Sequence, residues 1–186
     1  MPPKVKVTKE DIIAAAVELV RKNGADALGA RAVAAALNCS TQPVFSNFSA
    51  MEQLRLAVVQ EADRLCNRYI AQETERGQYP AYKASGMAYI RFAKEEKELF
   101  KLLYMRNRSK EDAASDEMTD QMKATVTQAT GLEGQGANLF HLEMWAYVHG
   151  IAAMFATGFL DLDWDLVSKM LTDAYQGLRK QYGLEG

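Results

Sequence analysis

The chain has 186 residues, 48% of them hydrophobic and 25% charged, which suffices for one large domain or two small ones with a sizeable core. Its 22 basic and 24 acidic residues leave a net charge of −2, so the overall charge by itself predicts no affinity for nucleic acid. The charge is unevenly distributed, however, because residues 1–50 carry +2 and the remaining residues carry −4. This asymmetry indicates that an anionic partner would bind at the N-terminal end. No N-terminal apolar run resembles a signal peptide, and no stretch approaches the roughly 18 to 20 apolar residues of a membrane span, so we expect a soluble cytoplasmic protein without membrane contact.

The composition favours an all-α fold. Prolines number four, long stretches are rich in Ala, Leu, Met, Glu, Lys and Gln, and no segment alternates as a strand would, so about nine helices are expected. The predicted domains are residues 1–50 and residues 51–186. Two cysteines, Cys39 and Cys66, are too few for a disulfide framework and are expected to be reduced core residues.

The first helix is predicted from about Lys9 to Lys22. Thr8 is its N-cap, Asp11 is the acid three residues on, and Gly24 ends it. Its apolar stripe is formed by Ile13, Ala16, Val17 and Val20.

Two short helices meet at a tight corner. The first, about Ala30 to Leu37, is predicted to bury Ala30, Val33, Ala34 and Leu37. Asn38 follows the end of this helix, at a position that favours the left-handed backbone conformation. Ser40 or Thr41 can serve as the N-cap of the next helix. Pro43 falls in the first turn of that helix, where its missing N–H is harmless, and Val44 and Phe48 point inward.

The corner has two interpretations. Two short helices packed on an amphipathic helix form a helix-turn-helix unit, whose second helix can lie in the major groove of DNA. The exposed face of that second helix would present the polar side chains of Thr41, Gln42, Ser46 and Asn47. Positive charge would come from Lys4, Lys6, Lys9 and Arg31. The helix N-termini at Thr8 and Thr41 would offer N–H groups to phosphates. The alternative is a packing corner with a polar surface, and the local pattern leaves both open.

The helices that follow are longer. Ser49 to Glu52 reads as a capping box that opens a helix to about Glu75. Its apolar face is predicted to contain Leu54, Val58, Leu65, Tyr69 and Ile70. Further helices are predicted at about residues 81–93, 96–105, 110–129, 137–160 and 165–182.

A set of N-terminal residues forms a recognisable pattern: Thr8, Gly24, Leu28, Arg31, Val33, Ala34, Ser40, Val44, Phe48, Glu52 and Leu54. With these residues the segment resembles the DNA-binding domain of the TetR family of bacterial transcriptional regulators. The resemblance covers roughly the first 55 to 60 residues and is specific as a set rather than at any one position. The residues that the helix-turn-helix reading and this resemblance place on DNA are Lys4, Lys6, Thr8, Arg31, Ser40, Thr41, Gln42, Phe45, Ser46 and Asn47.

Several positions depart from the family pattern. Gly29 stands where the family usually has a Thr or Ser that caps the second helix. Phe45 replaces a Tyr whose hydroxyl forms a hydrogen bond with a DNA phosphate in the family. Ser46 and Asn47 replace longer basic or aromatic groups, and Met51 replaces a frequent Lys. Each lost phosphate contact weakens binding and lowers its salt dependence.

The C-terminal helices resemble one subgroup of TetR effector-binding domains, which carry a Trp followed by His-Gly in a late helix. Here these residues are Trp145, His149 and Gly150. The resemblance implies a homodimer, expected through the last two helices, and an effector site. The aromatic and thioether side chains of the region predict that the small effector is mostly apolar. Nine methionines suit an irregular apolar pocket, although a helical core with methionine filler gives the same pattern. The candidate effector contacts are Met87, Phe92, Tyr104, Met118, Met122, Phe140, Met144, Trp145 and His149.

His149 has two possible roles: a hydrogen bond to an effector, or one to a backbone carbonyl across the helix bundle. A metal site and a cofactor are not expected, because His141 lies eight residues away, roughly 12 Å along a helix, and no Cys or carboxylate cluster has ligand spacing. An enzyme is not expected either, because no nucleophile–base pair, phosphate-binding Gly loop or paired-carboxylate motif is present.

The sequence therefore predicts a ligand-responsive DNA-binding regulator, a repressor as is usual in the family, that binds a palindromic operator as a dimer. The alternative, motivated by Gly29, Phe45 and Met51, is a small-molecule-binding dimer with weakened or lost DNA binding.

Overall fold

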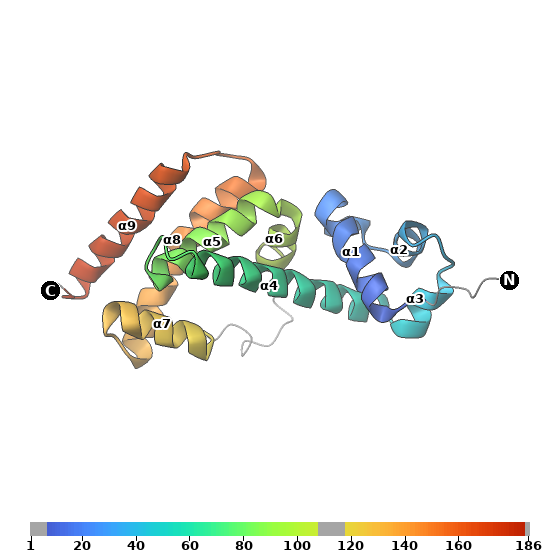
Figure 1. Cartoon of the computed structure of the whole chain (residues 1–186), viewed down its shortest axis with the longest axis horizontal. Helices are drawn as coiled ribbons and strands as arrows, with labels where there is room; N and C mark the ends of the chain where they lie inside the picture. The colour runs from blue at the N-terminus through green and yellow to red at the C-terminus, as the bar shows by residue number, and fades with distance from the viewer. Residues whose placement is uncertain (1–6, 108–117, 185–186) are drawn as a thin grey trace. The chain divides into compact units, whose positions relative to one another are not determined.

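The computed structural model describes residues 7–107 and 118–184. Within these two ranges it contains nine α-helices, one short 3₁₀ helix and no strand (Figure 1). This result confirms the predicted all-α class and the predicted number of helices. Lys4 and Lys6, both expected to touch DNA, lie outside the described residues.

The chain divides into two compact units. The first comprises the described residues up to Leu65 together with Glu96–Arg106, and the second comprises Cys66–Glu95 together with the described residues from Asn107 onward. The long helix α4 (Met51–Glu75) contributes its first part to one unit and its last part to the other. A functional division at residue 50 stays a prediction.

The first unit is built around α1, which packs against the short helices that surround it. These elements are α1 (Lys9–Asn23), the 3₁₀ helix η1 (Ala25–Ala27), α2 (Ala30–Ala36), α3 (Gln42–Asn47) and α6 (Lys97–Tyr104) (Figure 1). The first two α-helices end within one residue of their predicted ends. The buried apolar residues that join the helices include Ile12, Ala16, Val20, Val33, Val44, Phe48, Leu54 and Val58.

Five residues of this unit that were predicted to be core are only half-buried, namely Ile13, Ala30, Leu37, Cys39 and Leu65. Ile12 is fully buried, whereas Ile13 is only half-buried. Ile12 lies four residues before Ala16, at the centre of the buried stripe, and the next residue is rotated by about 100° toward its edge. Ala30 and Leu37 are also half-buried, because they stand at the two ends of α2, where only one side of the helix is covered.

The start of α1 follows the prediction in detail. The Thr8 hydroxyl accepts a hydrogen bond from the Asp11 N–H (3.1 Å), and the Thr8 N–H donates to the Asp11 carboxylate (2.9 Å). These two bonds form a capping box and lower the pKa of Asp11. At the start of α4 the predicted pair of Ser49 with Glu52 is wrong, because the Ser49 N–H donates to Oε1 of Gln53 (3.0 Å) instead.

The second unit is centred on α5, which packs against α7, α8 and α9. Its helices are the end of α4, α5 (Ala81–Glu95), α7 (Asp120–Thr130), α8 (Gly134–Thr157) and α9 (Trp164–Gln181). Gly86 allows this close packing, since a Cβ there would lie 3.1 Å from Leu171 on α9 and 3.4 Å from Val148 on α8. The core between the helices includes Met87, Ile90, Phe92, Phe140, Ile151, Phe155 and Leu171.

Three predicted helix bounds in this unit differ from the structure by three residues or more, and one of them is the start of α8 at Gly134 rather than at residue 137. The helix expected from residue 110 begins at Asp120 within the described residues, because Thr119 caps it by accepting a hydrogen bond from the Met122 N–H (3.2 Å). The helix expected to reach residue 160 ends at Thr157, because Gly158 adopts a left-handed φ of 70°.

Candidate functional site

Helix α3 has one buried and one exposed side. Val44 is fully buried and Phe48, its C-cap, is nearly so, which confirms that both point inward. Gln42, Phe45 and Ser46 are exposed on the other side, and Phe45 leaves 53% of its surface in solvent. The helix therefore presents an amide, an aromatic ring and a hydroxyl while two apolar side chains hold it against the unit.

The turn before α3 takes the predicted shape. Asn38 has a φ of 51°, in the left-handed region, and the next residue, Cys39, donates its N–H to the Ala34 carbonyl (3.0 Å). Pro43 lies in the first turn of α3. Thr41 stands at the N-cap, but its backbone is already helical and its side chain makes no capping bond, so the predicted cap is absent.

The exposed face is smaller than predicted. Thr41 and Asn47 are half-buried, and the Asn47 side-chain amide donates to the Pro43 carbonyl of the same helix (2.8 Å). Ser40 is exposed just before the helix. The Thr8 N–H, predicted to be offered to a phosphate, donates to Asp11 instead.

Positive charge near this surface comes from outside α3. Lys9 places its Nζ atom 5.2 Å from the centre of the Phe48 ring, and Arg31 is exposed on α2. Arg55, which was not predicted to lie near this surface, is at the start of α4 and donates a hydrogen bond to the Leu28 carbonyl (3.4 Å). Arg21 is paired with Glu18 and Glu96. The contacts of Arg21 with Glu96 and of Arg55 with Leu28 gave no signal in the sequence, because they depend on how the helices pack.

Gly29 is the N-cap of α2 and provides no capping side chain. Its φ of −148° and ψ of 154° are extended values that any residue adopts. A Cβ at this position would meet no atom within 4 Å. The Ser or Thr that the TetR resemblance leads one to expect here would therefore fit.

The candidate effector contacts are dispersed. Met87, Phe92, Phe140 and Met144 are buried in the core of the second unit, and Met118 and Met122 are half-buried at α7. Trp145 is partly exposed and stacks on His149, with 4.8 Å between ring centres. Tyr104 belongs to the first unit, where it lies against Phe100.

Two tyrosine–histidine hydrogen bonds join α5 to α8. The Tyr82 hydroxyl lies 3.1 Å from Nδ1 of His141, and the Tyr89 hydroxyl lies 3.0 Å from Nδ1 of His149. His149 thus bonds a side-chain hydroxyl, a partner that neither of its two predicted roles named. Burial lowers the pKa of both histidines and raises the pKa of both tyrosines.

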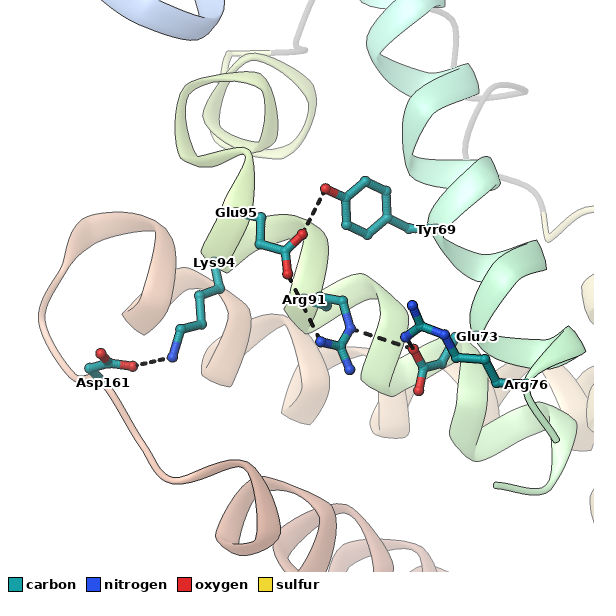
Figure 2. Close-up of polar contacts among 7 residues, drawn as sticks. All are labelled: Tyr69, Glu73, Arg76, Arg91, Lys94, Glu95 and Asp161. Atoms are coloured by element: carbon teal, nitrogen blue, oxygen red, sulfur yellow. Dashed lines mark hydrogen bonds and ion pairs between the residues drawn. The ribbon is translucent and has the colours of Figure 1, made fainter. Parts of the chain in front are cut away.

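A cluster of charged side chains around the buried Glu73, which we call the Glu73 cluster, was not predicted (Figure 2). It is formed by Tyr69, Glu73 and Arg76 on α4 with Arg91 and Glu95 on α5. Glu73 Oε2 accepts from Nη1 of Arg76 (2.8 Å) and lies 3.4 Å from Nε of Arg91. Tyr69 donates to Glu95 (2.9 Å), which lies 3.9 Å from Nη1 of Arg91.

The sequence did contain a signal for this cluster. The buried stripe of α4 runs through Leu54, Val58, Ala62 and Cys66, and Glu73 continues it seven residues later. Leu65, Tyr69 and Ile70, predicted for this face, are half-buried at its edge. A carboxylate on the buried stripe of a helix requires a polar partner, and Arg76 and Arg91 provide it.

Neither a metal site nor a membrane span appears in the part of the chain that the structure describes. No group of three or more His, Cys, Asp or Glu side chains in residues 7–107 and 118–184 could hold a metal ion. None of the helices found there is long and apolar enough to cross a membrane.

Comparisons with known proteins agree with this architecture. Residues 12–58 match the family of bacterial regulatory proteins of the tetR type, and residues 82–175 match the tetracyclin repressor-like C-terminal domain. No curated protein sequence gave a significant match. A TetR-like transcriptional regulator from Rhodococcus sp. RHA1 superposes with a TM-score of 0.68 at 16% identity, over 96% of this chain and 98% of that chain.

A TetR family member from Streptomyces coelicolor A3 superposes with a TM-score of 0.60 at 18% identity, over 89% of this chain and 96% of that chain. At such identities these likenesses establish the fold, and the two family matches establish the relationship. Members of the family are transcriptional regulators rather than enzymes. The chain belongs to the TetR family of DNA-binding transcriptional regulators.

Proposed function

We propose that this protein is a ligand-responsive repressor that binds a palindromic operator as a homodimer. The observation that carries the proposal is the sidedness of α3, with Val44 and Phe48 buried and Gln42, Phe45 and Ser46 exposed. In the major groove, a glutamine side chain can pair with adenine, an aromatic ring can contact a thymine methyl group and a hydroxyl can bond either base edges or phosphate.

A dimer is required because one short helix reads only a few base pairs. Two copies of α3 placed one DNA turn apart, about 34 to 36 Å, would enter successive major grooves. The proposed interface is formed by α8 and α9. Its support is a set of large apolar side chains that these helices expose, namely Leu139, Leu142, Trp145 and Tyr147 on α8 and Leu166 on α9.

The effector would bind in the second unit. The buried Met87, Phe92, Phe140 and Met144 offer an apolar and adaptable environment for a small, mostly apolar molecule. Such a ligand acts only through its different affinities for the DNA-bound and the free form of the dimer. Repression, rather than activation, is the usual outcome in the family and is proposed on that ground.

The test is selection of binding sites from random duplex DNA, followed by fluorescence anisotropy on the enriched sequence. The proposal predicts a palindromic site with half-sites one DNA turn apart, bound by two chains. Because few cations flank α3, the affinity should fall less steeply with salt than is usual for DNA-binding proteins. Enrichment of no sequence, or binding by a single chain, would contradict the proposal.

A second function is favoured by particular observations on the same surface. Helix α3 carries no Lys or Arg, Gly29 gives α2 no capping side chain, and Phe45 has no hydroxyl for a phosphate. These features suit a small-molecule-binding dimer whose DNA binding has weakened or been lost. Ligand binding without any saturable, sequence-dependent DNA binding at low salt would select this alternative.

A further inference from the structure

The Glu73 cluster contains two polar atoms that the protein leaves without a hydrogen-bond partner. Across the described residues, the buried side-chain atoms in this state are Oε1 of Glu73 and Nε of Arg91. Glu73 is only 2% exposed. Its Oε2 atom takes both contacts to arginine, and Figure 2 shows the other oxygen of the carboxylate directed away from them.

Such a pair of atoms is unfavourable in an interior. A buried acceptor on a charged group loses its hydration, and only a hydrogen bond compensates for the loss. Nε of Arg91 lies 3.4 Å from Oε2 in an ion pair without the alignment of a hydrogen bond. The cluster thus offers one acceptor and one donor that belong to the same Glu73–Arg91 contact.

The surroundings of this contact are largely aromatic. Tyr69 lies one helical turn before Glu73, on the same side of α4, and meets Phe92 of α5 edge to face at 5.5 Å. The Arg91 guanidinium lies 4.6 Å from the centre of the Trp164 ring at the start of α9. An apolar molecule with one polar end is the kind of ligand that fits such a site.

The charges of the cluster limit what that polar end can be. Glu73 and Glu95 balance Arg76 and Arg91, so the cluster is neutral as it stands. A carboxylate has no proton to donate to Oε1 of Glu73 and would lie against its charge. An ammonium group has no lone pair for Nε of Arg91 and would lie against two guanidinium groups. A hydroxyl or a primary carboxamide both donates and accepts.

We propose that the Glu73–Arg91 contact is the polar anchor of the effector site. It binds a neutral hydroxyl or carboxamide group of a largely apolar effector and discriminates against carboxylates and amines. The effector O–H or N–H donates to Oε1 of Glu73, and its oxygen accepts from Nε of Arg91. This inference rests on the proposed ligand response, because it names the chemical class of the ligand of the second unit.

The experiment compares four probes of equal chain length: octanol, octanamide, octanoate and octylamine. Each is titrated into the full-length protein, and binding is followed by calorimetry and by tryptophan fluorescence, to which Trp164 next to Arg91 contributes. The wild type should bind octanol and octanamide at least about tenfold more tightly than octanoate and octylamine. Equal affinities for all four probes would overturn the proposal.

The Glu73→Gln variant tests the anchor directly. It leaves Arg76 and Arg91 without their carboxylate, so octanoate should gain about tenfold in affinity while the preference for octanol disappears. Glu75→Gln is the matched control, since Glu75 is exposed on the same helix two residues on, and it should keep the wild-type order. If Glu73→Gln does not fold, as judged by circular dichroism, Glu73→Asp replaces it and should lose the preference by withdrawing the oxygen.

The failure of this inference differs from the failure of the proposed function. If a library compound releases operator DNA with the same affinity in the wild type and in Glu73→Gln, the function stands and the anchor is refuted. If the preference for octanol over octanoate is present in the wild type and absent in Glu73→Gln, but no ligand alters DNA binding, the anchor stands and the ligand response is refuted. Occupation of the contact by a water molecule alone would appear as no binding of any probe, which also refutes the anchor.

Discussion

Replacing Gly29 with Ser is expected to stabilise the first unit. The backbone at Gly29 already has the extended N-cap geometry, and the new Cβ meets no atom within 4 Å. The Ser oxygen can therefore accept an N–H from the first turn of α2 without any rearrangement. A Ser N-cap is worth about 1 kcal/mol more than Ala, and removing a Gly from the unfolded chain adds about 0.4 to 1 kcal/mol.

Gly29→Ala isolates the hydroxyl, because it shares the effect on the unfolded chain and lacks the cap. We expect Gly29→Ser to exceed Gly29→Ala by about 1 kcal/mol in the free energy of unfolding. Urea denaturation followed by far-UV circular dichroism is the assay, since Trp145 and Trp164 both lie in the second unit and their fluorescence would miss the change. Gly77→Ser is the negative control, because a φ of 65° disfavours Ser. Equal stability of the Ser and Ala variants would refute the capping argument.

Further predictions concern the second unit. Burial lowers the pKa of His141 and His149 below the ordinary value of 6.5, so the unfolded chain takes up protons before the folded chain as the pH falls. The melting temperature should therefore be highest above about pH 6.5 and should decrease below that pH. The decrease should be smaller in a variant with both histidines replaced by Gln. Gly86→Val should lower the free energy of unfolding by about 1 to 3 kcal/mol, because a Cβ at this position would lie only 3.1 Å from Leu171. Urea denaturation followed by tryptophan fluorescence measures the loss. Gly177→Ala should instead add about 0.8 to 1 kcal/mol in the same assay, since its Cβ meets nothing within 4 Å in α9; a loss of stability there would contradict the propensity argument.

Features set by neighbouring residues could be predicted from the sequence. The capping box of Thr8 with Asp11 and the left-handed Asn38 each depend on a few residues in a row. The sidedness of α3 follows from the spacing of Val44 and Phe48. For the same reason the helix ends in the first unit were predicted closely.

Features set by distant residues could not be predicted. Glu73 meets Arg91 from another helix, and Tyr89 meets His149 sixty residues away. Asn47 is less exposed than predicted, and its amide, which has several possible partners, donates to the Pro43 carbonyl. A local pattern shows that a polar group lies on a helix face, and only the packing of the helices shows which group it contacts.

The claim that the exposed face of α3 enters DNA is tested most directly by Gln42→Glu. A carboxylate in the first turn of a helix is favourable for the helix, so this variant should fold at least as well as the wild type. It should nevertheless lose sequence-specific binding in fluorescence anisotropy on the selected operator, because the new charge faces the phosphates. Gln121→Glu, an exposed glutamine in the first turn of α7, should bind like the wild type. Undiminished operator binding by a well-folded Gln42→Glu would contradict the account.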